Sequence, residues 1–118
     1  MTVKIYSYQK CSTCQKALKF LDHAQIAYQV FPIREQPPTS AELKQALDYV
    51  QGDLKKLLNT SGEEYRRLNL KERLSSMSHE EVFELLSHNG MLVKRPFVLG
   101  ENFILLGFKE DAWKAKLL

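Results

Sequence analysis

Two cysteines, Cys11 and Cys14, lie where the sequence changes from an extended pattern to a helical one, and they are the only cysteines in the chain. Residues 3–8 alternate apolar and polar side chains, as a half-buried strand does. Behind the cysteines, small and apolar residues recur at helical spacing, at Ala17, Leu18, Leu21 and Ala24. Extending this stripe back by one turn reaches Cys14. We therefore expect Cys14 on the buried face of the helix and Cys11 at or just before the helix start.

The two sulfurs are expected to differ in their chemistry. At a helix start, unpaired backbone N–H groups and the positive end of the helix dipole stabilise a negative charge. Cys11 would then ionise readily, while the thiol of Cys14 would be sheltered. Thiol–disulfide exchange needs this arrangement, because a thiolate of low pKa attacks and a second sulfur resolves the mixed disulfide. The pattern predicts a redox pair with Cys11 as nucleophile and Cys14 as resolving cysteine.

Three other roles compete with the redox interpretation of the cysteine pair. A structural zinc site usually has four ligands, and the sequence offers no second C-x-x-C, while its histidines are scattered at His23, His79 and His88. A structural disulfide across so short a loop would remove little entropy from the unfolded chain. Two inert core cysteines remain an alternative, which the helix-start position of Cys11 disfavours. We therefore expect no metal at this site.

Length and charge limit the remaining function classes. A chain of 118 residues suits one domain, residues 1–118, with its own hydrophobic core. The sequence opens directly into a strand without a signal-peptide pattern, and no apolar run is long enough to span a bilayer. We expect a cytoplasmic monomer without membrane contact, in a reducing compartment where a C-x-x-C is more often catalytic than structural. The net charge of +3 comes from basic residues interleaved with glutamates, which disfavours direct nucleic-acid binding.

The order of the expected elements predicts the fold. After the first helix, residues 27–31 predict a second strand, residues 39–90 a cluster of helices, and residues 97–99 with 103–106 a β-hairpin. A last helix follows, with its inward side formed by Phe108, Ala112, Trp113 and Leu117. A βαβ unit followed by a ββα unit is the thioredoxin-like pattern, in which a C-x-x-C opens the first helix. We therefore predict an α/β, thioredoxin-like fold with a mixed four-stranded sheet and a helical insertion.

Three helix starts in the insertion have the spacing of a capping box, in which a hydroxyl and a carboxylate three residues apart satisfy free backbone N–H groups. The pairs are Thr39 with Glu42, Ser61 with Glu64, and Ser78 with Glu81. Gly52 is expected to end the first of these helices.

Arg95 and Pro96 precede the third expected strand. Most X–Pro bonds are trans. A thioredoxin-like fold, however, places a cis-proline here, facing the C-x-x-C, so we expect a cis bond between Arg95 and Pro96. Arg95 would then bring a permanent positive charge to the cysteines. The alternative role of Arg95 is that of a surface cation beside Lys94.

Several polar residues are candidates to complete the site. The candidate substrate-binding residues are Lys10, Ser12, Thr13, Asn59 and Pro96. Lys10 adjoins Cys11 and would lower its pKa through its charge. Asn59 opens a turn rich in hydroxyl and amide groups, which is either part of a polar wall at the cysteines or only the cap of the next helix.

Together these motifs resemble the arsenate-reductase-like (ArsC-like) family of small thioredoxin-fold proteins, and more closely its Spx/MgsR-type branch. The resemblance runs over nearly the whole chain. Its segments are Tyr6 with residues 11–17 (CSTCQKA), 33–39 (IREQPPT), 59–66 (NTSGEEYR), 92–96 (LVKRP) and 107–110 (GFKE).

The resemblance implies that Cys11 is the family's nucleophile and that Arg95 is its arginine before proline. It implies no bound cofactor, glutathione with glutaredoxin or thioredoxin as electron donor, and a small thiol or a protein thiol or disulfide as partner. True arsenate reductases hold the oxyanion with three arginines. Here Asn59 stands at the middle position and Leu106–Gly107 at the late one. One guanidinium instead of three removes most of the charge-assisted hydrogen bonds to the oxyanion, so arsenate is predicted to be a poor substrate.

The Spx-type branch implies an alternative function as a redox-sensing transcriptional regulator. Spx proteins bind the C-terminal domain of the RNA polymerase α subunit and sense oxidation through their C-x-x-C. Gly52 lies where that branch has a glycine important for this contact, although ending a helix would explain the residue equally well. The sequence thus predicts a thiol oxidoreductase, with a partner protein of RNA polymerase as the alternative.

Overall fold

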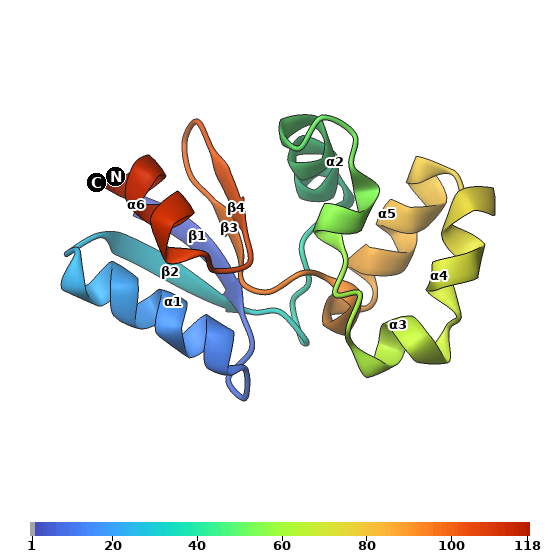
Figure 1. Ribbon diagram of the computed structural model, residues 1–118, viewed down its shortest axis with the longest axis horizontal. Helices are drawn as coiled ribbons and strands as arrows, with labels where there is room; N and C mark the ends of the chain where they lie inside the picture. The colour runs from blue at the N-terminus through green and yellow to red at the C-terminus, as the bar shows by residue number, and fades with distance from the viewer. Residues whose placement is uncertain (1) are drawn as a thin grey trace. The chain divides into compact units, whose positions relative to one another are not determined.

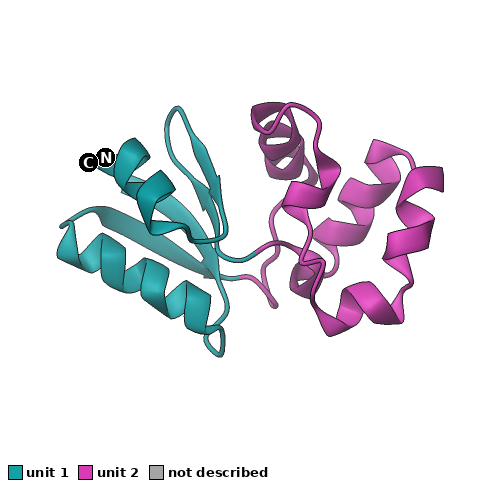
Figure 2. Ribbon diagram, viewed as in Figure 1, with its two compact units in different colours: residues 1–32, 95–118 teal, residues 33–94 magenta. Residues whose placement is uncertain are grey.

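The computed structural model describes residues 2–118, which fall into two compact units (Figure 2). The first, which we call the sheet unit, combines the chain up to Pro32 with Arg95–Leu118. The second, which we call the helical unit, is Ile33–Lys94. The chain leaves the sheet unit after its second strand and returns to it just before the third.

A mixed four-stranded sheet in the order β2-β1-β3-β4 forms the centre of the sheet unit (Figure 1). Its strands are β1 (Thr2–Ser7), β2 (Ala27–Pro32), β3 (Phe97–Leu99) and β4 (Ile104–Leu106). β1 is parallel to β2 and antiparallel to β3, and β3 is antiparallel to β4. A parallel pair needs a crossover connection, which α1 (Ser12–His23) supplies. The predicted α/β, thioredoxin-like fold is confirmed.

Helices α1 and α6 (Glu110–Leu117) pack on one face of this sheet (Figure 1). Strand side chains alternate between the two faces, so Val3 and Ile5, two positions apart in β1, reach the same core. The buried core consists of Val3, Ile5, Ala17, Leu21, Val98, Leu105 and Trp113. The predicted stripe of α1 is confirmed, including Cys14, which is 0% exposed. The prediction that Ala112 faces inward is wrong, because this residue is exposed. Trp113 and Leu117 are one turn apart and share the inward face of α6, and Ala112 is rotated about 100° around the helix axis from Trp113.

The helical unit consists of short helical segments. They are α2 (Ser40–Tyr49), η1 (Leu54–Leu57), α3 (Glu63–Arg67), α4 (Leu70–Arg73), η2 (Leu74–Ser76), α5 (His79–Ser87) and η3 (Gly90–Leu92). None of the helices formed by residues 2–118 combines the length and the apolar character that crossing a bilayer demands.

Two of the three predicted capping boxes are present. At the start of α2, the Glu42 N–H donates to the Thr39 hydroxyl at 3.1 Å, and the Thr39 N–H donates to the Glu42 carboxylate at 2.9 Å. Ser78 and Glu81 make the same pair of bonds at the start of α5, also at 3.1 and 2.9 Å. An N-cap of this kind contributes about 1 kcal/mol, which suits the starts of short helices.

The third predicted box, Ser61 with Glu64, is wrong. α3 begins with Gly62 as its N-cap, and no side chain caps it. Glu64 instead accepts from the Arg67 guanidinium at 2.7 Å and from the Asn89 amide at 3.2 Å. These contacts engage the carboxylate that the box would have needed.

Gly52 follows the end of α2, as predicted. Its N–H donates to the Leu47 carbonyl at 2.9 Å, and its φ of +83° lies in the left-handed region that favours glycine after a helix. A Cβ atom here would meet nothing within 4 Å. The backbone conformation, rather than lack of room, therefore favours glycine at this position.

Candidate redox site at Cys11 and Cys14

Cys11 is the N-cap residue of α1, with extended backbone angles (φ −97°, ψ 116°). A turn after β1 places it there, because the Cys11 N–H donates to the Tyr8 carbonyl at 3.0 Å. The Gln15 side chain donates to the Gln9 carbonyl at 2.8 Å and so ties this turn to the first turn of the helix. The predicted position of Cys11 at the helix start is confirmed.

The surroundings of the partly exposed Cys11 thiol favour its charged form. Burial raises its pKa, but the backbone N–H groups of Cys14 and Thr13, the Cys14 thiol and the positive charge of Arg95 together lower it by more. The N–H groups belong to the first turn of α1, where the helix supplies no carbonyl to accept from them. The Cys11 side chain nevertheless forms no capping hydrogen bond with these N–H groups. The pKa of Cys11 is therefore lower than that of an ordinary cysteine.

Cys14 has the opposite character. Its side chain is buried, and burial, together with the neighbouring Cys11 sulfur, raises the pKa of Cys14 to about 11. The Tyr8 N–H, which donates to Cys14 Sγ at 3.5 Å, and the Ser7 hydroxyl oppose this rise. Both cysteines are free thiols, and Cys14 carries its proton at neutral pH. The two sulfurs thus differ in the direction that the sequence predicts.

Arg95, two residues before β3, supplies positive charge to Cys11. Its guanidinium lies 5.2 Å from the centroid of the Tyr8 ring, within the range of a cation–π contact. Tyr6 of β1 pairs with Phe97 of β3. Continuing this antiparallel register by two residues brings Arg95 beside Tyr8, at the end of β1 from which the Cys11 turn starts.

Pro96 belongs to the same end of the sheet. The bond between Arg95 and Pro96 is cis, as predicted. Pro96 is buried, and its carbonyl accepts from the Gly107 N–H at 2.9 Å, which ties the start of β3 to the residue after β4.

The other predicted residues of the sheet unit are less involved. Lys10 and Ser12 are exposed on either side of Cys11, and Thr13 is half-buried. Thr13 acts on the Cys11 sulfur through its backbone N–H. Contacts of these three side chains with a substrate remain predictions, as does an effect of the Lys10 charge.

Asn59 and Gly52 belong to the helical unit and not to the unit that carries the cysteines. The Asn59 N–H donates to the Leu92 carbonyl at 2.8 Å, and the Asn59 carbonyl accepts from the Gly62 N–H at 3.1 Å. These bonds confirm a turn at residues 59–62. The roles of Asn59 in substrate binding and of Gly52 in partner binding stay predictions.

Sequence reasoning missed two contributors, Ser7 and Tyr8. Ser7 is only 6% exposed and its hydroxyl acts on the Cys14 thiol. Strand alternation could have revealed it, since Ser7 continues the inward face of Val3 and Ile5, and a buried hydroxyl needs a partner. No sequence pattern could have revealed the contribution of Tyr8, because the conformation of the turn, and not the residue type, directs its N–H to the Cys14 sulfur.

The chemistry available here is that of two thiols. Among residues 2–118, no three histidine, cysteine or acidic side chains lie together in a group that could hold a metal ion. A partly exposed thiol of lowered pKa next to a buried thiol whose pKa is raised to about 11 has the two unequal sulfurs that thiol–disulfide exchange uses.

Comparison with known proteins identifies the family of this chain. The model of the ArsC family matches residues 6–116, nearly the whole chain. The chain belongs to the ArsC family. It is 46% identical over 114 residues to the uncharacterized protein YusI of Bacillus subtilis, covering 97% of both chains. It is 28% identical over 109 residues to the global transcriptional regulator Spx of Listeria innocua, covering 92% of this chain and 82% of Spx.

Solved structures of relatives share the whole architecture. An ArsC family related protein from Bacteroides fragilis superposes with a TM-score of 0.89 at 43% identity, covering 98% of this chain and 97% of that one. A possible arsenate reductase from Streptococcus mutans gives a TM-score of 0.86 at 36% identity, covering 95% and 97%. Relatives of this chain thus include proteins described as arsenate reductases and proteins described as transcriptional regulators.

The unequal sulfurs predict a selective, pH-dependent alkylation. Iodoacetamide should label Cys11 before Cys14, and the rate should rise with pH through a midpoint below the roughly 8.5 of a free cysteine. In the Arg95→Ala variant the midpoint should move to higher pH, because the cation that favours the thiolate is gone. The labelling rate near neutral pH should fall about two- to fivefold, the value expected for a partly exposed charge pair. Mass spectrometry of the labelled peptides measures both effects.

The matched control is Arg95→Lys, which keeps a positive charge and should retain most of the wild-type rate. Lys10→Ala tests the other nearby cation in the same assay. Equal labelling of Cys11 and Cys14, or an ordinary midpoint for Cys11, would contradict the assignment of the nucleophile.

Proposed function

We propose that the protein is a cytoplasmic thiol–disulfide oxidoreductase in which Cys11 attacks and Cys14 resolves. The observation that most supports this proposal is the difference in exposure and pKa between the two sulfurs. Cys11 is partly exposed and has a lowered pKa beside Arg95, whereas Cys14 is buried with a pKa raised to about 11. Two inert core cysteines would give no reason for a lowered pKa at the exposed member of the pair.

In the first step, the Cys11 thiolate attacks one sulfur of a target disulfide. A bond forms between Cys11 Sγ and that sulfur, the target's S–S bond breaks, and the other target sulfur leaves as a thiolate that takes up a proton. The positive charge of Arg95 favours the attacking thiolate.

In the second step, Cys14 loses its proton and attacks Cys11 Sγ, which releases the remaining target sulfur as a thiolate. Burial holds the pKa of Cys14 high, and the Cys11 sulfur, through its charge and its hydrogen bond, raises it further. The mixed disulfide removes the Cys11 charge, so the pKa of Cys14 falls only after the first step has occurred. Two electrons pass from the cysteine pair to the target, and the pair is left as a disulfide.

A second thiol compound must return the cysteine pair to its reduced form. We propose thioredoxin, or glutathione with glutaredoxin, as this donor. Either one supplies two electrons and two protons per cycle by the same exchange chemistry. No bound cofactor is needed for these steps.

The division of roles predicts where the reaction stops in each variant. With a glutathionylated peptide as target, wild type should release the free peptide and lose two hydrogens as its disulfide forms. Cys14→Ser should stop at a mixed disulfide on Cys11, and Cys11→Ser should react more slowly on the order of 100-fold, because the remaining thiol is protonated. Intact-protein mass spectrometry distinguishes these products. A similar rate for Cys11→Ser would show that the nucleophile is misassigned.

Arsenate is a poor substrate in this proposal. The chain keeps Arg95 but has Asn59 and Leu106–Gly107 where the arsenate-reducing relatives are expected to have arginines. Each charge-assisted hydrogen bond contributes about 1.5–3 kcal/mol, so the loss of two weakens oxyanion binding by at least about 100-fold.

With either donor system, we expect little arsenate reduction at sub-millimolar arsenate and slow turnover only at high arsenate concentration. An NADPH-coupled assay with thioredoxin or glutaredoxin measures the rate, and an arsenate reductase with three arginines serves as positive control. Efficient turnover at low arsenate would overturn the interpretation of Asn59.

A regulatory function is the second candidate, favoured by the similarity to Spx over 92% of the chain. In this proposal the cysteine pair is a redox switch, and the helical unit binds the C-terminal domain of the RNA polymerase α subunit near Gly52. Gly52 is exposed, with open space around its Cα, so a partner could approach it closely.

A pull-down with the isolated α-subunit domain tests this candidate, using reduced and oxidised protein side by side. Gly52→Arg should abolish binding by filling the contact. The left-handed φ of Gly52 makes any side chain unfavourable by about 1–2 kcal/mol, so Gly52→Asn is the matched control, because asparagine tolerates this conformation best. Retained binding in Gly52→Asn and loss in Gly52→Arg support a direct contact, whereas no binding in either redox state removes this candidate.

A further inference from the structure

A groove between α1 and α6 in the sheet unit plays no part in the thiol chemistry. It encloses about 720 Å³, a volume within the range of small-molecule sites. Its lining comes mainly from Lys16, Lys19 and Phe20 on one side and from Phe108, Lys114 and Leu118 on the other. Because Lys16, Phe20 and His23 recur at helical spacing, a single face of α1 forms one wall.

Aromatic rings form the apolar part of this groove. The Phe20 and Phe108 rings meet edge to face with centroids 5.8 Å apart. Trp113, which is 1% exposed, backs them with centroid distances of 5.7 Å to Phe20 and 4.9 Å to Phe108. Leu118, 75% exposed, adds an apolar side chain at the rim. A planar apolar group would find a preformed surface here.

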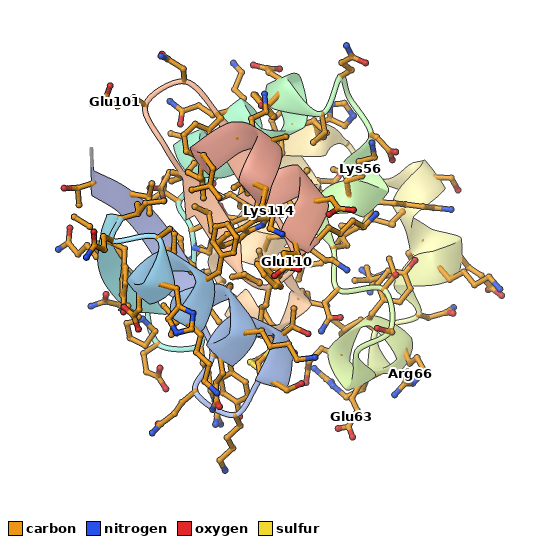
Figure 3. The ribbon with its side chains drawn as sticks, turned by 60° about the vertical axis from the view of Figure 1, so that its left-hand side comes forward. Lys56, Glu63, Arg66, Glu101, Glu110 and Lys114 are labelled. Carbon is orange, nitrogen blue, oxygen red and sulfur yellow. The ribbon has the colours of Figure 1, made fainter. Side chains whose placement is uncertain are left out.

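The charged residues of the groove are mostly basic. Lys114 and Glu110 face each other on α6 at 4.0 Å, so their charges largely cancel (Figure 3). Within residues 2–118, neither Lys16 nor Lys19 forms an ion pair with a carboxylate. The groove therefore combines an aromatic surface with two ammonium groups that no acidic side chain neutralises.

We propose that this groove binds an aromatic organic anion, with the aromatic body on Phe20 and Phe108 and a carboxylate, sulfonate or phosphate near Lys16 and Lys19. The rings supply apolar contact, and the ammonium groups supply charge-assisted hydrogen bonds to the anion. A neutral aromatic compound would use only the first of these contributions, and a small inorganic anion only the second.

The test uses anilinonaphthalenesulfonate, a dye with this chemistry. Trp113 is the only tryptophan of the chain and lies directly behind the groove. Dye bound in the groove should therefore take up energy from Trp113, in a saturable way with one site per chain. Naphthalenesulfonate should displace the dye about tenfold better than the neutral naphthalenesulfonamide, and raising the salt from roughly 50 to 500 mM should reduce this difference.

Charge reversal locates the site. The double variant Lys16→Glu/Lys19→Glu should weaken dye binding about tenfold or more. The matched control is Lys55→Glu/Lys56→Glu, which changes the net charge equally on exposed residues of η1 in the helical unit (Lys56 is labelled in Figure 3). This control should bind like wild type. All four lysines are exposed, and thermal unfolding checks that both variants fold normally.

Three results would overturn the proposal. The first is absence of energy transfer from Trp113 at saturating dye. The second is equal displacement by the sulfonate and the sulfonamide, which would leave an apolar surface without anion recognition. The third is an equal loss of binding in both double variants, which would show a general effect of net charge rather than a site at α1 and α6.

Discussion

Burial of one face of α1 against β1 is the interaction on which the candidate site depends. Cys14, Ala17 and Leu21 form that face, and each is 0% exposed, as are Val3 and Ile5 of β1. Burying several such side chains contributes several kcal/mol at about 25 cal/mol per Å², whereas one N-cap contributes about 1 kcal/mol. The Cys11 side chain forms no close cap with its own helix. The core, rather than a side-chain cap by Cys11, therefore holds the helix start at which Cys11 lies.

The difference between the two sulfurs follows from one helical turn of separation. At the first turn, free N–H groups and the Arg95 charge outweigh burial, so the pKa of Cys11 falls. One turn later, burial dominates and the pKa of Cys14 rises to about 11. A single guanidinium is enough to favour a thiolate that carries one charge. In the proposed function, the same single guanidinium offers few charge-assisted bonds to an oxyanion, which is why arsenate is predicted to be a poor substrate.

Sequence reasoning predicted the fold where local patterns decide it. The strand before Cys11, the buried stripe of α1 and the boxes at Thr39 and Ser78 depend on residues a few positions apart. It failed where a competing contact decides. Asn89, distant in sequence, shares the Glu64 carboxylate with Arg67, and the box predicted with Ser61 is absent. Such competition cannot be read from spacing.

The sequence by itself determined which residues can carry the chemistry and on which elements they lie. A cysteine at a helix start, a second one on its buried face and an arginine before proline are all local facts. The tertiary structure alone decided what surrounds them, because strand pairing joins residues far apart in the chain. The register of β1 with β3 brings Arg95 to the Tyr8 ring, and the turn after β1 directs the Tyr8 N–H to Cys14. Packing of α6 beside α1 likewise created the basic aromatic groove, which has no counterpart in either helix alone.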